Sequence, residues 1–422
     1  MANITLNNVS DQTVSGTTGG DTITLTGRGS NVYIDGLAGG DTISSATATP
    51  AGYTNATVMG GLGVDNISGF SSNSMLFGGQ GGDTILLNAG GANLTVFGGQ
   101  DDDTITASSG STALIFGNMG VDTINLTGFG DGATVFGGQG DDAITGGAGS
   151  RAYISGDIGD DSITGVAGSL ASVFGGQGRD TITTTGGATQ ALLFGNDGDD
   201  TIAASGDGSS VFGGQGSDQL TISGDSSILF GNLGNDTITV DGGATSATVF
   251  GGQGSDTITA TAAGDNAYIS GDLGNDTITA GAVRATILGG DGNDSITNSN
   301  NMSALSGGAG SDIFTVTGTT VGDNNSTLTI TDFVSGTDFV DIGGATASQS
   351  TNYTEAKVNG GFTEAQKAAG NLQDGQYLFV AGNTDGYLFS GTDTAITLTG
   401  LNSLDSFSAT DILGTTPAPA AG

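Results

Sequence analysis

A ten-residue pattern that recurs along most of the chain constrains its fold more than any other feature. One copy, residues 250–259, reads Phe-Gly-Gly-Gln-Gly-Ser-Asp-Thr-Ile-Thr. Copies align on their aspartate at spacings of 18 to 20 residues, with one spacing of 24. This aspartate row comprises Asp21, Asp41, Asp65, Asp83, Asp103, Asp122, Asp142, Asp161, Asp180, Asp200, Asp218, Asp236, Asp256, Asp276, Asp294 and Asp312. A short fixed period predicts a solenoid in which each repeat forms one coil.

Each repeat contains two short β-favouring segments. Residues 122–126 and 133–136 are one such pair, separated by the looser turn 127–132. Strand side chains alternate between two faces, so the isoleucine two residues after each aspartate points inward and its threonine neighbours point outward. We therefore expect an all-β fold: a parallel β-roll, or β-solenoid, of about 16 coils with a small C-terminal β-rich domain.

The charge balance restricts the possible partners. The chain has 43 acidic and 6 basic residues, a net charge of −37, and only two of the acids are glutamate. Short carboxylates in glycine-rich turns suit hard cations, which require oxygen ligands. Phosphate would repel so acidic a chain, which argues against nucleic-acid binding. Cysteine and histidine are absent, so a disulfide framework and a thiolate or imidazole site are excluded.

The repeats resemble the RTX nonapeptide, G-G-x-G-x-D-x-U-x, of calcium-binding β-rolls, and the resemblance covers residues 16–315. It implies that calcium lies between successive turns and that all sixteen aspartates of the row are metal ligands. Only one edge of each coil keeps the motif, so we expect one row of Ca²⁺ ions. Without the metal, stacked carboxylates would repel one another, so folding should depend on calcium.

We expect four regions in the chain. Residues 1–15 form a leading strand or cap, 16–315 the roll, 316–345 a junction, and 346–422 a secretion-like region with a disordered tail. Residues 329–342 resemble the D-F-x-x-G-x-D segment that follows the repeats in many type I secreted proteins. A helix is expected from Thr363 to Ala369, with a threonine N-cap and Gly370 as C-cap.

The same resemblance implies export by the type I secretion machinery from a C-terminal, uncleaved signal. The N-terminus has neither the basic region nor the apolar core of a Sec signal peptide. No run approaches the roughly 18 apolar residues needed to cross a bilayer, so no membrane span is expected. These features predict a secreted protein at the cell surface.

Two outward rows could carry the function. The first is a phenylalanine row after the inward residue of the second strand, made up of Phe77, Phe97, Phe116, Phe136, Phe174, Phe194, Phe212, Phe230 and Phe250. Exposed, such a stripe would mark an assembly surface; alternatively its rings stack on one another or are covered by the C-terminal region. The second is the Thr-x-Thr face, which suits a solvated strand but also resembles ice-binding surfaces. Ala143, Ala203 and Gln219 interrupt it.

A second period is superimposed on the first. Gly-Gly-Gln-Gly turns begin at Gly137, Gly175, Gly213 and Gly251, 38 residues apart, and Gly-Asp or Gly-Asn turns alternate with them. Duplication of a two-coil unit is the simplest explanation. Whether alternate coils meet a partner differently stays open at this point.

The sequence favours a structural function over an enzymatic one. Acidic pairs such as Asp141 and Asp142 are conceivable glycosidase carboxylates, but each pair includes an aspartate that the metal would occupy. Our hypothesis is therefore a calcium-loaded protein that self-assembles outside the cell, as an S-layer subunit or a filament. Its partner would be a second copy of itself, with cell-surface polysaccharide as a further candidate. The alternatives are an ice-binding protein, an adhesin or, less favoured, a polysaccharide-modifying enzyme.

Overall fold

The computed structural model describes residues 1–45, 52–87, 92–108, 110–128, 130–241, 244–261, 265–300, 302–317, 327–342, 352–370, 372–373, 376–391 and 394–413. The chain divides into two compact units, Met1–Gly216 and Ser217–Gly422. Each unit contains coils of two strands, one in each of two facing sheets, here called sheet A and sheet B. The fold is an all-β parallel β-solenoid of about 16 turns with a small C-terminal β region.

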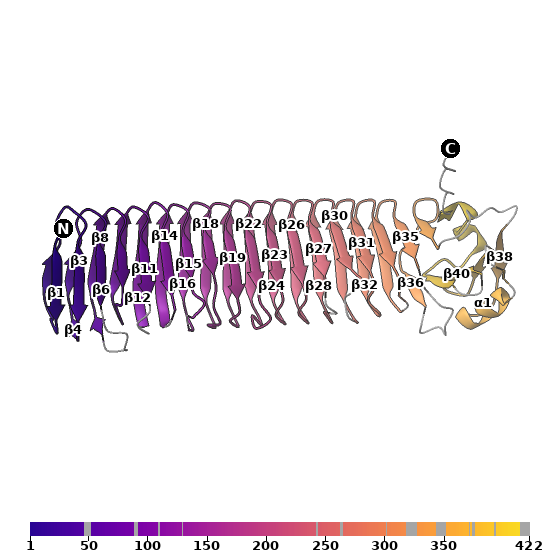
Figure 1. The fold of residues 1–422 in the computed structure, drawn as a ribbon. Coiled ribbons are helices and arrows are strands. Elements are labelled where there is room, and N and C mark those ends of the chain that lie inside the picture. Colours follow the sequence, from indigo (N-terminus) through magenta and orange to yellow (C-terminus); the bar gives the residue numbers. More distant parts are fainter. Residues whose placement is uncertain are drawn as a thin grey trace, which may run out of the picture. The chain divides into compact units, whose positions relative to one another are not determined.

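In the first unit every coil contributes a strand to each sheet, in parallel with the next coil (Figure 1, indigo to magenta). Sheet A holds β1 (Asn3–Asn7), β3 (Thr22–Thr26), β6 (Thr42–Ser45), β9 (Asn66–Ser68), β11 (Thr84–Leu87), β13 (Thr104–Ala107), β15 (Thr123–Asn125), β17 (Ala143–Thr145), β19 (Ser162–Val166), β21 (Thr181–Thr184) and β23 (Thr201–Ala204). Sheet B holds β2 (Thr13–Ser15), β5 (Tyr33–Asp35), β8 (Thr57–Leu62), β10 (Met75–Gln80), β12 (Ala92–Gln100), β14 (Ser111–Met119), β16 (Thr134–Gln139), β18 (Tyr153–Ile158), β20 (Ser172–Gln177), β22 (Leu192–Asp197) and β24 (Ser210–Gln215). A minor pair joins β4 (Gly29–Ser30) to β7 (Tyr53–Thr54).

The second unit repeats this arrangement and then changes. Its sheet A holds β25 (Gln219–Ile222), β27 (Thr237–Val240), β29 (Thr257–Ala260), β31 (Thr277–Ala280), β33 (Ser295–Asn298), β35 (Ile313–Val316), β37 (Phe339–Asp341) and β42 (Ile412–Leu413). Its sheet B holds β26 (Ile228–Leu233), β28 (Thr248–Gln253), β30 (Tyr268–Leu273), β32 (Thr286–Asp291), β34 (Ala304–Ala309) and β36 (Leu328–Ile330). Strand β36 then pairs with β41 (Thr394–Leu398), and antiparallel β40 (Gly386–Ser390) and β39 (Tyr377–Ala381) follow, with β38 (Tyr353–Lys357) parallel to β39.

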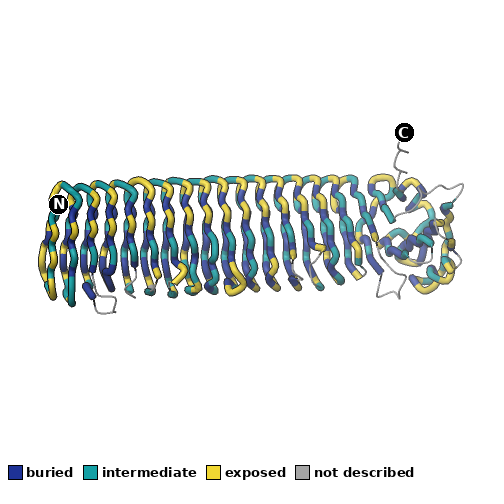
Figure 2. The backbone as a smooth tube through the Cα atoms, in the orientation of Figure 1, coloured by how far each residue is buried: buried dark blue, intermediate teal, exposed yellow. Residues whose placement is uncertain are grey.

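The core is a thin double line of aliphatic side chains between the two sheets. The inward residues fall where alternation predicts, and both Ile124 and Val135 have no exposed surface. Sheet A strands show an exposed–buried–intermediate–buried pattern (Figure 2), as in β21 and β27. Successive coils pair identical residues, Ile238 with Ile258 for example, so each core position forms a continuous row.

Three details differ from expectation. The stack does not close at residue 315, because β36 and β37 pair with the strands of the preceding coil. Sheet B strands continue through the Gly-Gly-Gln of the motif, as β16 does, so the turn is shorter than predicted. The helix α1 (Phe362–Ala369) begins one residue before Thr363, and its N-cap is Gly361 without a side-chain hydrogen bond. The threonine cap was therefore wrong, whereas Gly370 is the C-cap.

The C-terminal region packs around its own apolar cluster. Helix α1 contributes Phe362 and Ala365, which lie against Val380 and Phe389 of the antiparallel strands. The predicted disordered tail falls outside the described residues. Across the ranges that are described, no helix combines the length and apolar character that a membrane crossing requires.

Candidate metal centre along the aspartate edge

Each aspartate of the row lies in the turn that leads from a sheet B strand into a sheet A strand. All sixteen side chains are buried. The backbone N–H of one aspartate donates to Oδ1 of the aspartate in the next coil, as from Asp122 to Asp142 at 2.8 Å. The N–H···Oδ1 distances from Asp21 through Asp180, and again from Asp218 through Asp294, lie between 2.6 and 2.9 Å. These bonds fix every carboxylate in the same orientation.

The second oxygen of these carboxylates is different. In thirteen aspartates Oδ2 is buried without a hydrogen-bond partner among the described residues: Asp41, Asp65, Asp83, Asp103, Asp122, Asp142, Asp161, Asp180, Asp236, Asp256, Asp276, Asp294 and Asp312. A buried charged oxygen without a partner is strongly unfavourable. A regular series of such atoms therefore indicates a row of cation sites.

The first motif glycine borders the space into which this oxygen points. A Cβ placed on Gly251 would lie 2.4 Å from Oδ2 of Asp256 and 2.6 Å from the carbonyl oxygen of Gly271 in the next coil. At Gly137 the corresponding distances are 2.3 Å to Asp142 Oδ2 and 2.6 Å to the Gly156 carbonyl oxygen. A carboxylate oxygen from one coil and a backbone oxygen from the next thus border one small space, which only glycine leaves open.

Burial raises the pKa of these carboxyl groups, and the hydrogen bond from the neighbouring coil only partly opposes it. The pKa rises to about 7 for Asp83, Asp103, Asp142 and Asp161. It rises to about 6 for Asp65, Asp122, Asp180, Asp236, Asp256, Asp276, Asp294 and Asp312. For most of them, a neighbouring aspartate raises the pKa further. The edge is thus unfavourable for negative charge unless a cation accompanies it.

The row ends in carboxylates whose two oxygens both accept hydrogen bonds. Asp21 accepts from the backbone of Ala2 and Thr17. The structure adds a further member that the sequence reading missed, Asp338, which accepts from the Asp312 N–H at 3.1 Å and from the Val334 N–H at 2.8 Å. Its signal was present as Gly336-Thr337-Asp338, the second half of the motif, but the preceding glycine pair is missing.

These residues fit a hard divalent cation. Among the described residues no three acidic side chains gather closely enough to hold a metal by themselves. The edge supplies one carboxylate per coil, so backbone carbonyl oxygens must complete any coordination shell, and calcium accepts such mixed oxygen ligands.

Comparison with known families agrees with this chemistry. Residues 51–85, 86–112, 127–150, 194–225 and 222–244 match the RTX calcium-binding nonapeptide repeat. The repeats are RTX calcium-binding repeats. Residues 238–412 match the C-terminal domain of the M10 serralysin peptidases. RTX repeats together with this domain are typical of type I secreted proteins. A search of curated proteins found no match.

The RTX edge carries a second, outer hydrogen-bond series that the sequence did not reveal. In coils where the residue before the aspartate has a side-chain acceptor, it accepts the backbone N–H of its equivalent in the next coil, as Asp141 does from Asp160 at 2.8 Å and Asn235 from Ser255 at 2.7 Å. The two members of the acidic pair considered as glycosidase carboxylates therefore lie in different environments. Asp142 is buried in the RTX row, whereas Asp141 is exposed and bonded along the edge.

The nine phenylalanines lie on the outer face of sheet B and are half-buried. In the first unit the rings of Phe77, Phe97, Phe116 and Phe136 stack at centroid distances of 4.9 to 5.2 Å. Phe230 and Phe250 stack at 5.0 Å in the second unit. Adjacent rings therefore cover each other's faces, and the expected self-stacking is present. Whether the row also serves assembly stays a prediction.

Two RTX coils replace the phenylalanine with serine in a coordinated way. Next to Ser155, the ring of Tyr153 lies between Phe136 and Phe174, at centroid distances of 5.6 and 5.2 Å. The Ser155 hydroxyl donates to Asp157 Oδ1 at 2.6 Å. Tyr268, Ser270 and Asp272 repeat this set in the second unit. The aromatic row therefore continues where its phenylalanine is missing.

Proposed function

We propose that this protein is an extracellular structural protein that folds on calcium after export and then self-assembles at the cell surface or in the matrix. The RTX repeats and the serralysin C-terminal domain support calcium binding and type I secretion. The further step, assembly as an S-layer or filament, is supported by the distribution of charge.

That distribution is the observation that carries the proposal. From β3 to β23 in the first unit, and from β25 to β35 in the second, no sheet A strand contains a charged residue. A chain of net charge −37 thus keeps its acids off these sheet A strands in each unit. Calcium would neutralise the aspartate edge, so two copies could approach without strong repulsion.

In this proposal calcium has a structural role, and we assign no catalytic residue. The aspartates with an unpartnered Oδ2, together with the glycine carbonyl oxygens, would hold the ions. Each bound ion supplies positive charge that allows neighbouring coils to stack. Coordination is then part of the free energy of folding.

Electron microscopy of the full chain, with millimolar calcium and after its removal, tests the proposal. We expect ordered sheets or filaments with calcium and unassembled chains without it. Circular dichroism on the same samples should show strand signal only with calcium. Protein that stays monomeric in millimolar calcium would contradict the assembly function.

Ice binding is a second candidate because the Thr-x-Thr pairs of β27, β29 and β31 lie in register. Thr237 pairs with Thr257 and Thr257 with Thr277, so identical hydroxyls repeat along an uncharged face. Inhibition of ice recrystallisation by the calcium-loaded protein would support this function. Normal crystal growth at high protein concentration would dismiss it.

A further inference from the structure

From the coil of Asn118 to that of Gly290, the outer face of sheet B next to the aspartate edge alternates between coils in residue size, whereas Gly61, Gly79 and Gly99 occupy the same place in three successive earlier coils. The second motif position is the residue after the first motif glycine, as Gly252 is after Gly251. In register, it holds Asn118, Gly138, Asp157, Gly176, Asn196 and Gly214 in the first unit, and Asn232, Gly252, Asp272 and Gly290 in the second. The third position holds Met119, Gln139, Ile158, Gln177, Asp197 and Gln215, then Leu233, Gln253, Leu273 and Asp291. Coils with Asn or Asp at the second position, here called ridges, alternate with coils whose glycine at that position leaves a gap, here called troughs.

The backbone explains why glycine, asparagine and aspartate occupy the second position in these coils. Gly138 and Gly252 have φ of 124° and 115°, whereas Asn118 and Asp157 have φ of 84° and 78°. These values lie at positive φ, which asparagine and aspartate tolerate best after glycine. The same strained position therefore builds either a ridge or a trough, depending on which residue occupies it.

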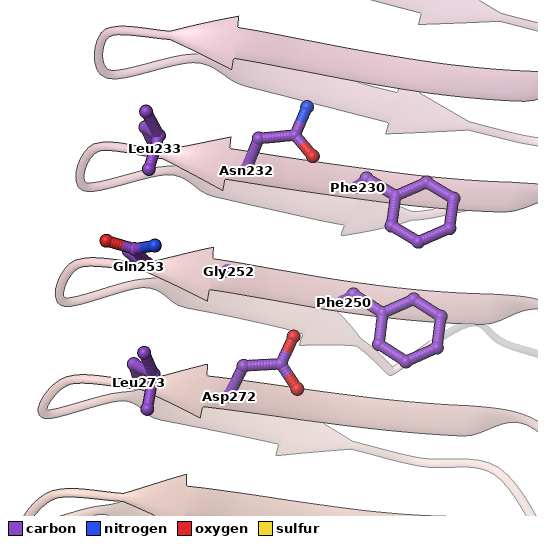
Figure 3. A pocket seen from close by; sticks show the side chains of 8 residues that line it. All are labelled: Phe230, Asn232, Leu233, Phe250, Gly252, Gln253, Asp272 and Leu273. Atoms are coloured by element: carbon purple, nitrogen blue, oxygen red, sulfur yellow. The ribbon is translucent and has the colours of Figure 1, made fainter.

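Each unit contains the resulting hollow at an equivalent place. In the second unit its volume is about 410 Å³, and Asn232 and Asp272 stand on either side of Gly252 (Figure 3). Phe230 and Phe250 border it on one side, while Leu233 and Leu273 lie at the turn. In the first unit a hollow of about 430 Å³ is lined by the equivalent Phe116, Asn118, Met119, Phe136, Gly138, Gln139, Asp157 and Ile158.

Four of the five ridges carry an exposed apolar side chain at the third position, and the fifth carries Asp197. Met119, Ile158, Leu233 and Leu273 are 43 to 49% exposed. The troughs carry exposed glutamines instead, such as Gln139 and Gln253. Ridges recur every second coil, a distance of roughly 9.5 Å from the usual spacing of strands.

We propose that this ridge-and-trough face of sheet B docks against the same face of a second copy of the chain. The inference rests on the proposed assembly function and assigns the contact to sheet B, and the uncharged face of sheet A is the competing interface that the experiment below distinguishes. A face with ridges on alternate coils is complementary to its own copy when the two are displaced by one coil. Another copy necessarily has the same period, whereas an unrelated partner has no reason to share it.

Polar groups on the face also match. A shift of one coil brings trough glutamines of one copy opposite ridge asparagines and aspartates of the other. Within one chain, the Gln215 amide nitrogen already donates to Asp197 Oδ1 at 2.6 Å, so a trough glutamine can bond a carboxylate of a ridge coil. Amide donors facing carboxylates make the contact favourable despite the net negative charge.

Flattening the ridges tests the proposal. In the variant M119Q/I158Q/L233Q/L273Q, each ridge side chain becomes the glutamine that the trough coils already carry, so the coils should still fold with calcium. We expect the protein concentration needed for assembly to rise roughly tenfold or more, because four partly buried apolar contacts are lost. Leu170→Gln is the matched control, because Leu170 is 47% exposed but lies at the opposite turn. It should assemble like the wild type.

The outcomes separate the two proposals. A folded four-site variant that assembles at the wild-type concentration overturns the docking face and leaves the assembly function standing. A wild-type chain that never assembles overturns both. Because the chain lacks cysteine, single-cysteine variants give a second measurement. When Ile158→Cys chains are mixed with Gln177→Cys chains, disulfide-linked dimers should form, because a one-coil shift places a ridge of one copy opposite the neighbouring trough of the other. Thr181→Cys on sheet A should not cross-link, and the reverse result would assign assembly to the threonine face.

Discussion

At the scale of single residues, the two oxygens of the repeat aspartate have separate tasks. Oδ1 accepts the N–H of the preceding coil's aspartate and aligns the coils, as Asp142 does for Asp122. Oδ2 is buried and points into the space beside the first glycine, where it requires a cation. Asparagine can perform the first task and not the second.

The first prediction uses this separation. Asp142→Asn should keep the acceptor for the Asp122 N–H, lower the number of calcium ions bound per chain and lower the melting temperature in calcium. A loss of roughly 1–3 kcal/mol is expected for a buried polar group that loses its partner. Asp338→Asn is the control for the number of calcium ions, because both oxygens of Asp338 accept backbone N–H groups, so this variant loses a hydrogen bond and no calcium ion. Isothermal titration with calcium measures the stoichiometry, and an equal loss in both variants would contradict the assignment.

The second prediction concerns the glycine beside that space. Gly251→Ala would place a methyl group 2.4 Å from Asp256 Oδ2 and 2.6 Å from the Gly271 carbonyl oxygen. We expect weaker calcium binding and a lower melting temperature in calcium. Gly186→Ala meets no atom within 4 Å and should leave both unchanged. If the two variants bind calcium equally well, the space beside Gly251 does not serve the metal.

At the scale of elements, each sheet B strand is tied to its neighbours by stacked rings as well as by backbone bonds. Phe97 has a ring on either side at 4.9 Å, nearly parallel to both. In the coil that has Ser155 in place of phenylalanine, the ring of Tyr153 preserves these contacts. Where they occur, the stacked rings thus add to the packing between neighbouring sheet B strands.

The third prediction follows from that contact. Phe97→Ala removes two stacked contacts, and we expect a loss of about 2 kcal/mol, because the side chain is half-buried. Leu170→Ala, at an exposed turn position, should change stability far less. Thermal unfolding followed by circular dichroism in saturating calcium gives both values. A melting temperature for Phe97→Ala equal to that of the control would show that the ring row contributes no stability.

Sequence periodicity predicted the strands, their faces and the aspartate row, because each is a local consequence of alternation and of one repeated motif. Other features depend on contacts between coils. Of the two hydrogen bonds that close the row at Asp338, one comes from the Val334 N–H, and Val334 occupies a variable position of the D-F-x-x-G-x-D segment. The hollow beside Gly252 results from its coil and both neighbouring coils, and α1 begins at Phe362 because that ring packs on Phe389.

At the scale of the whole molecule, charge is sorted by position. The sheet A strands of the repeats are neutral, while acids fill the aspartate edge and its outer series. The chain therefore depends on its ionic surroundings, because a highly charged edge favours the folded state only when a cation compensates it.

The fourth prediction is a pH dependence without calcium. Folding raises the pKa of row carboxyls to about 6 or 7, as at Asp256 and Asp142, from an ordinary value of 3.8. The folded state then binds more protons than the unfolded state, so stability is greatest below pH 4 and falls as the pH rises through 6 to 7. Calcium-depleted protein should have more strand signal by circular dichroism at pH 5 than at pH 8. Saturating calcium should restore the signal at pH 8, and depleted protein with equal signal at both pH values would contradict the charge argument.

The uniform orientation of the carboxylates makes the two ends of a coil stack chemically different. Each aspartate N–H finds its acceptor in the following coil, and each first glycine is bordered by a carbonyl oxygen from that same coil. In a stack shortened from its C-terminal side, the last aspartate N–H would have no acceptor. The last cation site would lack the glycine carbonyl oxygen that the next coil provides. One shortened from its N-terminal side would end only in a carboxylate oxygen that has lost a donor. The stack thus has two chemically different ends, as a helix has. Asp338, in the segment after Asp312, supplies the hydrogen-bond acceptor that the C-terminal end requires.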